Sequence, residues 1–246
     1  MSKNIGSKFM QQTKYIEMKW QTQQEKGLLQ PSLEKPYAPN AKLIDLPRPT
    51  ELHIPEVSLQ KAIDNRKTLR KYSAKALSLD EFAFLLWITQ GVKMVTSRPV
   101  TLRTVPSAGA RHAFETYILV NNVNGLQPGL YRYIAIKHSL LVVKKGIALA
   151  ARLTAACANQ VQVLNSAVTF FWVAILERMY WRYDERGYRY LHLDAGHVCQ
   201  NLYLAAEAID SGVCAIAAFH DDQVNKVLEL DGEKEFTIYI ATLGKK

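Results

Sequence analysis

Hydrophobic and polar positions divide the chain into two parts. Residues 1–55 are mainly polar and hold six of the nine prolines, whereas apolar positions recur with helical or strand-like spacing from residue 56 onward. Proline lacks a backbone donor and interrupts regular elements. We therefore predict that residues 1–55 form an extended arm wrapped over another surface, and that residues 56–246 form a single domain.

Helical patterns begin directly after the arm. Ser58 is placed to cap a short helix over residues 59–65, and Ser78 and Glu81 have the spacing of a capping box for a helix that runs to residue 90. Gly91 is expected to end that helix at the C′ position. Further helices are predicted at residues 147–160, at residues 191–210 with Gly212 as the stop, and from Asp221 or Asp222 through Leu228.

Strand-like runs alternate with these helices. Residues 114–122, 129–133 and 140–145 are separated by the turn sequences "NGLQPG" and "KHS", which predicts an antiparallel meander. Helices mixed with a largely antiparallel sheet indicate an α+β fold in one layer rather than regular βαβ repeats. Additional strands are predicted at residues 166–176, 213–219 and 235–244.

Composition narrows the class of protein. An apolar content of 48% is enough for a well-filled core, and 31 Lys and Arg against 22 Asp and Glu give a net charge of +9. This charge fits either an anionic partner or an ordinary solvated surface. The charges are spread along the chain and form no nucleic-acid-binding motif, which argues against nucleic acid as a partner.

Cysteine and histidine usage exclude several kinds of site. Cys157, Cys199 and Cys214 are odd in number and lack metal-ligand spacing, so we expect reduced thiols and a cytoplasmic protein. No metal site is predicted, because the six histidines show no ligand spacing. The N-terminus has no signal core, and no run approaches the roughly 18 apolar residues of a membrane span.

Two segments carry candidate chemistry. In "NRKTLRKY", Arg66, Thr68 and Arg70 occupy alternate positions, so in an extended segment all three side chains would face a phosphate. The alternative is a loop with ordinary surface arginines. The terminal residues Lys245 and Lys246 fit either a frayed tail or a further phosphate contact.

The second segment is "RTVPSAG", residues 103–109, between a basic loop at residues 91–102 and a strand. Pro106 fixes its own φ, and Ala108 and Gly109 remove side-chain bulk, so this backbone is able to lie flat against a planar ligand. The alternative is a tight turn before a strand. The segment is neither a dinucleotide fingerprint nor a Walker loop, and no nucleophile elbow occurs elsewhere.

The chain from about residue 57 to 244 resembles the SagB/ThcOx-type dehydrogenases of the nitroreductase-like flavoproteins. The motifs that carry the resemblance are "NRKTLRKYS", "PSAG" and "AGHVCQNLYLAAEA". The resemblance implies a mostly antiparallel sheet flanked by helices and an intertwined homodimer. It also implies two FMN sites at the dimer interface, each built from both subunits.

The resemblance further implies roles for individual residues. Arg66 and Thr68 would hold the FMN phosphate, and Arg70 would approach the N1–C2 edge of the flavin, where a cation stabilises the reduced ring. The remaining implied contacts are Pro106, Ser107, Ala108 and Gly109 along the ring, Ala217, Ala218 and Phe219 with a backbone amide at N5, and Lys245 or Lys246 at the phosphate.

One departure from the family pattern concerns reactivity. Relatives that oxidise azoline rings usually carry Lys-Tyr where this chain has Arg182-Tyr183. Arginine effectively cannot lose its proton and so cannot replace a lysine base. Ala217 and Ala113 also differ from the glycine and proline usual at those positions.

The leading hypothesis is an FMN-dependent oxidoreductase in which flavin N5 takes hydride from NADH or NADPH and passes it to a small planar acceptor, nitroaromatic or quinone-like. Tyr183 and Arg182 are the candidate catalytic residues, Tyr183 for proton handling or substrate stacking. Two alternatives stay open, namely an azoline dehydrogenase that matures a ribosomal peptide and a non-catalytic flavin- or anion-binding protein.

Overall fold

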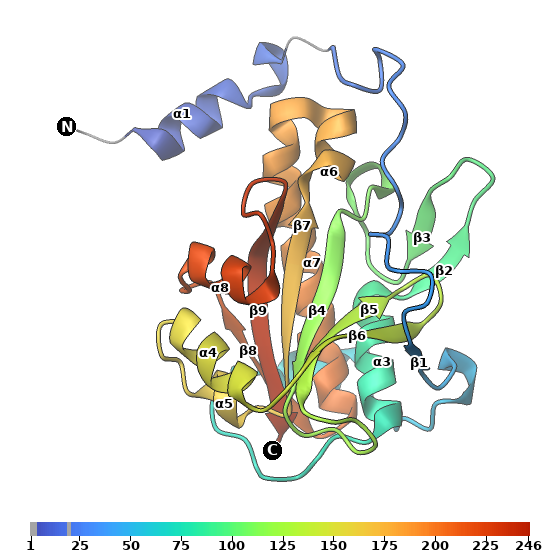
Figure 1. The fold of residues 1–246 in the computed structure, drawn as a ribbon, viewed down its shortest axis with the longest axis vertical. Helices are drawn as coiled ribbons and strands as arrows, with labels where there is room; N and C mark the ends of the chain where they lie inside the picture. The colour runs from blue at the N-terminus through green and yellow to red at the C-terminus, as the bar shows by residue number, and fades with distance from the viewer. Residues whose placement is uncertain (1–3, 19–20) are drawn as a thin grey trace.

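The computed structural model describes residues 4–18 and 21–246, which fold around one seven-stranded sheet (Figure 1). The strand order is β1-β6-β5-β4-β7-β9-β8, and every neighbouring pair is antiparallel. The strands are β1 (Leu43–Asp45), β4 (Phe114–Val120), β5 (Gly129–Ile134), β6 (Ser139–Lys145), β7 (Val168–Ile175), β8 (Ser211–Ile216) and β9 (Glu235–Lys245).

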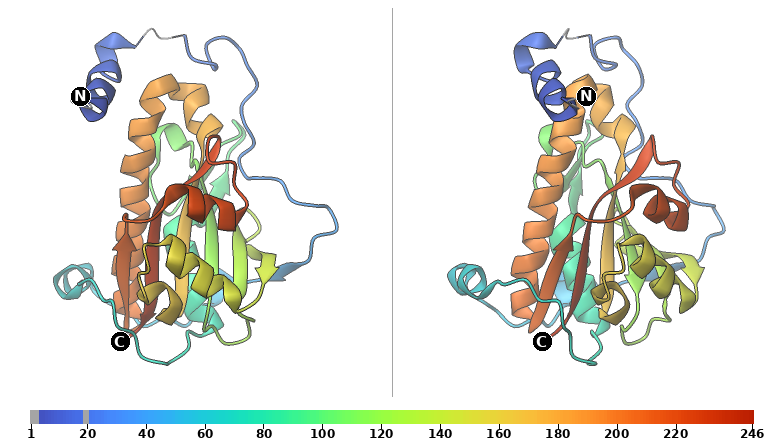
Figure 2. Two further views of the ribbon diagram at one scale, coloured as in Figure 1. Left: turned by 60° about the vertical axis from the view of Figure 1, so that its left-hand side comes forward. Right: turned by 90° about the vertical axis from the view of Figure 1, so that its left-hand side faces the viewer.

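This architecture confirms the predicted α+β fold and the meander β4-β5-β6. The prediction of one layer was wrong, because helices cover both faces of the sheet (Figure 2). Every residue of β4 and of β7 is buried, as expected for strands that are sandwiched between two helical layers.

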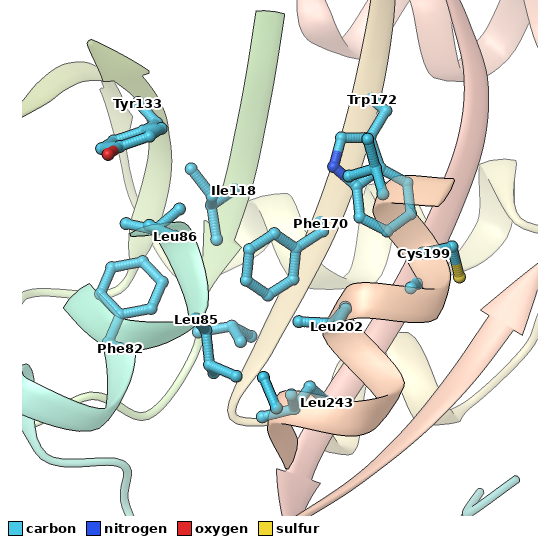
Figure 3. Close-up of a cluster of buried hydrophobic side chains, with 14 of the residues drawn as sticks. Phe82, Leu85, Leu86, Ile118, Tyr133, Phe170, Trp172, Cys199, Leu202 and Leu243 are labelled. Atoms are coloured by element: carbon cyan, nitrogen blue, oxygen red, sulfur yellow. The ribbon is translucent and has the colours of Figure 1, made fainter. Parts of the chain in front are cut away.

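One face of the sheet packs against α3 (Leu79–Gln90) and α7 (Gly187–Ala208). Figure 3 shows Phe82 and Leu85 of α3 directed toward Phe170 of β7, with Leu202 of α7 beside them. All four side chains are fully buried. Burial of this apolar surface stabilises the long helix α7 against the sheet, and α7 carries several of the site residues described below.

The opposite face is covered by three shorter helices, α4 (Ala148–Ala156), α5 (Gln162–Asn165) and α8 (Asp221–Leu228). Leu153 of α4 and Val224 of α8 are fully buried in the same cluster as Phe171 of β7. The predicted helix at residues 147–160 is therefore two helices, and residues 157–161 between them form a turn.

The start of α3 confirms the predicted capping box. Ser78 Oγ accepts from Glu81 N at 3.1 Å, and the Glu81 carboxylate accepts from Ser78 N at 2.9 Å. Gly91 directly follows the last residue of α3, Gln90, as predicted, and its φ of −57° is not left-handed. Glycine is required there for space instead, because a Cβ would lie 2.6 Å from the Trp87 carbonyl oxygen.

Three further elements differ from the predictions. The supposed basic loop at 91–102 contains the hairpin β2 (Val92–Val95) and β3 (Thr101–Arg103), and α6 (Leu176–Tyr183) with the 3-10 turn η4 (Asp184–Arg186) precedes α7. The helix α7 spans residues 187–208 rather than the predicted 191–210, and Gly212, the predicted stop, lies within β8. The predicted cap over α2 (Leu59–Asn65) is present, since Ser58 accepts from Lys61 N.

The arm is only partly extended. It contains α1 (Ile5–Gln12), the 3-10 turns η1 (Tyr15–Glu17) and η2 (Pro49–Glu51), and the edge strand β1. The helix α1 lies near the first turns of α7 (Figure 2), where Arg189 donates to the Met10 carbonyl. The domain boundary at residue 55 stays a prediction.

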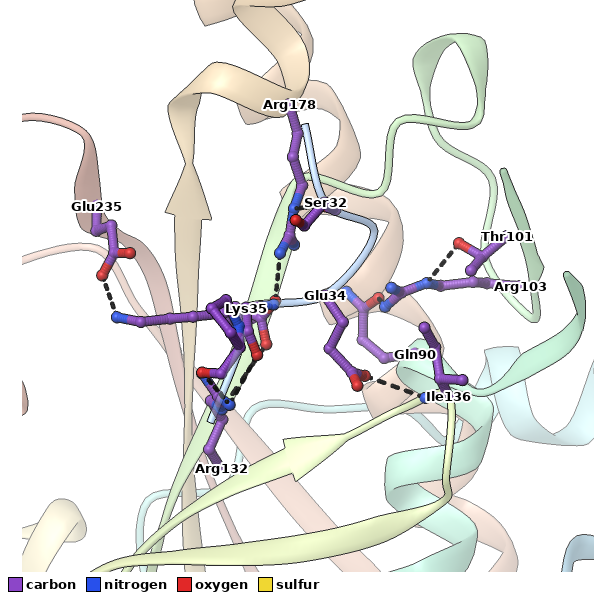
Figure 4. Close-up of polar contacts among 12 residues, drawn as sticks. Ser32, Glu34, Lys35, Gln90, Thr101, Arg103, Arg132, Ile136, Arg178 and Glu235 are labelled. Atoms are coloured by element: carbon purple, nitrogen blue, oxygen red, sulfur yellow. Dashed lines mark hydrogen bonds and ion pairs between the residues drawn. The ribbon is translucent and has the colours of Figure 1, made fainter. Parts of the chain in front are cut away.

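The central part of the arm is anchored to the body by buried charges (Figure 4). The Glu115 carboxylate accepts from Lys35 N at 2.7 Å and from Arg178 Nη2 at 2.6 Å. Arg132 Nη2 donates to the Lys35 carbonyl at 2.9 Å, and Lys35 Nζ forms an ion pair with Glu235. Glu115 is buried and forms ion pairs with Arg178 and, at 4.0 Å, with Arg132, so loss of either arginine would leave its charge poorly compensated.

Candidate functional site

The turn at residues 106–109 is fixed to the middle of α7. Ser107 Oγ donates to Asp194 Oδ2 at 2.6 Å, and Ala108 N donates to Asp194 Oδ1 at 3.2 Å. Ser107 Oγ also accepts from His112 N at 2.9 Å. Burial raises the pKa of Asp194, and the two hydrogen bonds from Ser107 and Ala108 oppose that rise. A single buried carboxylate thus holds the turn.

Position 109, in the 3-10 turn η3 (Ala108–Ala110), requires glycine for two reasons, its backbone conformation and the lack of space for a side chain. Its φ is +57°, and a Cβ there would lie 2.8 Å from Arg182 Nε and closer still to Tyr183 Oη. The structure therefore brings the two predicted catalytic residues, Arg182 and Tyr183, against the predicted ring loop. Pro106 of the same turn is exposed.

A cavity of about 440 Å³ lies along this loop and is lined in part by Arg103, Pro106 and His112. Arg103 is buried and donates to Gln90 Oε1 at 2.9 Å and to Thr101 Oγ1 at 3.2 Å. Burial lowers its pKa to about 10 and that of His112 to about 3, to which the nearby Arg103 charge contributes. His112 is therefore neutral near pH 7, and Arg103 is charged.

The predicted phosphate segment lies at a different position. Thr68 Oγ1 is 3.2 Å from Tyr203 Oη of α7, and the Arg66 guanidinium lies 5.3 Å from the centre of the Tyr203 ring. Tyr203 Oη also accepts from Ala215 N of β8 at 3.0 Å. Arg66 and Thr68 are therefore brought together, with Tyr203 as a shared contact that the sequence did not indicate.

Two glycines allow residues 66–73 to lie against the sheet edge. A Cβ on Gly212 would approach Leu69 within 2.6 Å of its Cβ, and one on Gly244 would approach Tyr72 to 2.6 Å. Leu69 N donates to the Val213 carbonyl at 2.9 Å. Arg70 lies farther along this segment and is exposed, at the edge of a hollow that also includes Lys71 and Tyr72.

The remaining predicted cofactor contacts are dispersed. Ala217, Ala218 and Phe219 follow β8 as an irregular segment rather than continuing the strand, and the Ala218 carbonyl accepts from Gln160 Nε2 at 2.7 Å. Ala217 and Ala218 are exposed, whereas Phe219 packs against the helices α4 and α8.

The two terminal lysines are not a frayed tail. Lys245 Nζ forms an ion pair with Glu81 and donates to the Ile209 carbonyl at 2.6 Å, and Lys246 Nζ pairs with Glu207 at 2.7 Å. Lys245 lies beside residues 66–73, since its carbonyl accepts from Ser73 N, whereas Lys246 N donates to the Asp210 carbonyl. Their charges are already neutralised by carboxylates, so they add little net attraction for a phosphate.

The two groups of residues are separated along α7. Asp194 and Tyr203 are nine residues apart, which corresponds to about 14 Å of helix rise and to opposite sides of the helix. One chain therefore carries a ring-loop group (residues 106–109, Arg182 and Tyr183) and a basic group (Arg66, Thr68 and Arg70) that do not meet.

A metal site requires clustered ligand side chains, and a membrane-spanning helix requires a long apolar run. Residues 4–18 and 21–246 contain no group of three or more His, Cys, Asp and Glu side chains arranged to hold a metal ion. Within the same ranges, every helix is too short or too polar to cross a lipid bilayer.

Comparisons with known proteins identify relatives that match most of this chain. A protein of Methanocaldococcus jannaschii that bears a provisional nitroreductase name is 31% identical over 193 residues, which cover 78% of this chain and 93% of that protein. The trifolitoxin-processing protein TfxB of Rhizobium leguminosarum is 30% identical over 63% of this chain and 44% of its own length.

Solved structures agree with this relationship. A provisionally named nitroreductase from Anabaena variabilis has a TM-score of 0.69 and 31% identity, and the match covers 84% of this chain and 42% of that one. The microcin synthetase McbBCD complex of E. coli contains a chain with a TM-score of 0.62 at 21% identity, over 85% of this chain and 79% of that one, and shares the fold.

A family model described as the nitroreductase family matches residues 63–245, which include both residue groups described above. The chain therefore belongs to the nitroreductase family.

Proposed function

We propose that this protein is an FMN-dependent oxidoreductase of the SagB/ThcOx type that works as a homodimer. In each site, the ring-loop group of one copy and the basic group of the other hold one FMN. The enzyme transfers reducing equivalents from NADH or NADPH to a small planar acceptor. Members of the nitroreductase family generally bind FMN, use these nicotinamides and form dimers, which supports the proposal.

The separation of the two groups along α7 is the observation that carries this proposal. Within the described residues, the ring-loop group and the basic group lie on opposite sides of α7 and about 14 Å apart along it, so neither group by itself contains both predicted halves of an FMN site. A second copy of the chain would supply the missing half. The incomplete halves are thus accounted for by a site between subunits.

The residues present fit FMN at both ends. Arg66 is partly exposed, and its planar guanidinium group and the Thr68 hydroxyl suit a phosphate. Arg70 is exposed and would approach the N1–C2 edge of the ring. Gly109 leaves room for Arg182 and Tyr183 against the loop, and Ala108 adds only a methyl group where an aromatic ring would pass. Bound FMN would supply the hydride chemistry, which explains why the chain needs no acid-base triad.

The protein's own residues would position the planar ligands and donate a proton to the acceptor. Asp194 and Ser107 fix the loop, so the face presented to a planar ligand is rigid before binding. Tyr183 carries its hydroxyl against Gly109, where it is able to donate a proton or hydrogen bond to an acceptor on that face. Arg182 places a guanidinium group at the same glycine.

A surface of α7 offers the contact between copies. Leu193 is 60% exposed, and a Cβ on Gly196 would find no atom within 4 Å. Glycine in a helix interior costs about 1 kcal/mol relative to alanine, and nothing within the chain requires it at this position. Close approach of a second α7 would account for it.

The test is cofactor binding followed by reduction. Purified protein should be yellow, should be dimeric, and should bleach without oxygen when NADH or NADPH is added. Arg70→Ala should lower FMN affinity or the rate of reduction, whereas Arg152→Ala, an exposed arginine of α4, should change neither. A colourless monomer that does not take up FMN at high concentration would refute the proposal.

A second candidate function is the oxidation of an azoline ring in a ribosomal peptide. The trifolitoxin-processing relative and the shared fold with the microcin synthetase chain favour it. The arginine at position 182 opposes it, because it cannot act as a base. Conversion of an azoline-bearing peptide by the wild type, or only by Arg182→Lys, would distinguish the two functions.

A further inference from the structure

Two guanidinium groups lie against one residue of the ring loop. Arg111 Nε donates to the Gly109 carbonyl at 3.1 Å, while Arg182 lies so close to the Gly109 Cα that a Cβ would be 2.8 Å from its Nε. Arg111 is buried, with its guanidinium 5.3 Å from the centre of the Trp181 ring. Burial, and then the charges of Arg182 and Arg98, lower the pKa of Arg111.

These charges have no acidic counterpart within the part of the chain that the structure describes. None of the six ion pairs there includes Arg98, Arg111 or Arg182. Asp194, the α7 carboxylate that holds the ring loop, already accepts from Ser107 and Ala108. A buried arginine normally has a carboxylate partner, because the desolvated charge is costly without one.

We propose that Arg111 and Arg182, with the exposed Arg98 beside them, bind a carboxylate on the acceptor that reacts at the ring loop. The proposal rests on the proposed function, since it names the substrate class of that same site. Two planar donor groups at one glycine match the two oxygens of a carboxylate, and they would hold the planar body of such an acid along the thin loop.

The position of the arginines favours the acceptor over the nicotinamide donor as the source of the anion. Arg182 is adjacent to Tyr183, whose hydroxyl lies at the same glycine, so the bound charge would be within a few atoms of the reacting group. The pyrophosphate of a dinucleotide lies much farther from its own reacting ring. An oxyanion at this place therefore belongs to a compact substrate.

The experiment compares two planar probes on the full-length protein by isothermal titration calorimetry, without turnover. We expect 4-nitrobenzoate to bind at least about tenfold more tightly than the neutral 4-nitrobenzamide. Arg182→Gln should abolish this preference, and Arg182→Lys should restore part of it. Arg152→Gln removes the same charge from an exposed position on α4 and should leave the preference intact.

Arg98→Gln provides a second variant in an exposed loop, where the fold tolerates the change, and should reduce the preference several-fold. Equal affinity for both probes, or a preference that survives Arg182→Gln and Arg98→Gln, would overturn the proposal. Loss of NADH affinity in Arg182→Gln with 4-nitrobenzoate binding unchanged would also overturn it, because the anion would then be the pyrophosphate.

These measurements test the carboxylate site separately from the proposed FMN-dependent function. A yellow, NADH-reducible protein with no preference for the acid would refute only the carboxylate site. A preparation that binds 4-nitrobenzoate in an Arg182-dependent manner but takes up no FMN would support the anion site and refute the flavin function.

Discussion

At the scale of single residues, the ring loop depends on one hydroxyl. Ser107 Oγ bridges the Asp194 carboxylate and the backbone N–H of His112, so it links α7 to both ends of the turn. The sequence predicted a slim turn from Pro106, Ala108 and Gly109, and the structure adds the reason that it is rigid. Asp194 carried no sequence signal, because an acidic residue in an amphipathic helix usually faces solvent.

We predict that Ser107→Ala destabilises the protein by about 1–3 kcal/mol, since it leaves a buried carboxylate with one hydrogen bond in place of two. The free energy of unfolding from urea titration measures the effect. Ser73→Ala, at an exposed position, is the matched control and should change stability by less than about 0.5 kcal/mol. Equal stability of the two variants would contradict this role of Ser107.

At the scale of elements, the position of residues 66–73 is decided by the strands beneath them. The alternation of Arg66, Thr68 and Arg70 predicted side chains on one side of an extended segment. In the structure, Arg66 and Thr68 share the ring and hydroxyl of Tyr203, while Arg70 lies farther along. Gly212, expected to stop a helix, instead makes room for Leu69.

Gly212→Ala should displace this segment, because the new methyl group would lie 2.6 Å from the Leu69 Cβ. We expect a loss of about 1–3 kcal/mol in unfolding free energy and weaker FMN binding, measured by denaturant titration and by fluorescence. Adding Leu69→Gly in the same protein removes the clashing Cβ and should restore part of the FMN affinity. Gly6→Ala, whose methyl group meets no atom within 4 Å, serves as the control.

At the scale of the whole molecule, the two residue groups require a second copy in order to meet. The exposed face of α7 with Leu193 and Gly196 is the proposed contact. A large side chain at residue 196 has open space within the chain, so it tests association without disturbing the fold.

Gly196→Arg should yield a folded monomer that no longer retains FMN, because each half-site would lose its counterpart. Light scattering coupled to gel filtration measures the mass, and absorbance measures the cofactor. Ala151→Arg, on the exposed side of α4, should remain dimeric and yellow. A Gly196→Arg protein that stays dimeric with FMN bound would exclude this face as the interface.

The sequence by itself determined the local elements whose signals are short-range. The capping box of α3, the helix α2, the antiparallel meander and the buried strand β7 follow from capping residues and from apolar periodicity, which depend on neighbours within a few positions. The resemblance of "NRKTLRKYS" and "PSAG" to one family also came from the chain alone, and the nitroreductase family was confirmed.

Only the tertiary structure decided which distant residues meet. The helical layer on each face of the sheet, the contact of Gly109 with Arg182 and Tyr183, and the pairing of Lys245 with Glu81 join segments that lie far apart in sequence. Such contacts depend on how α7 packs against the sheet, and packing is a property of whole surfaces. For that reason the separation of the two half-sites became visible only in the folded chain.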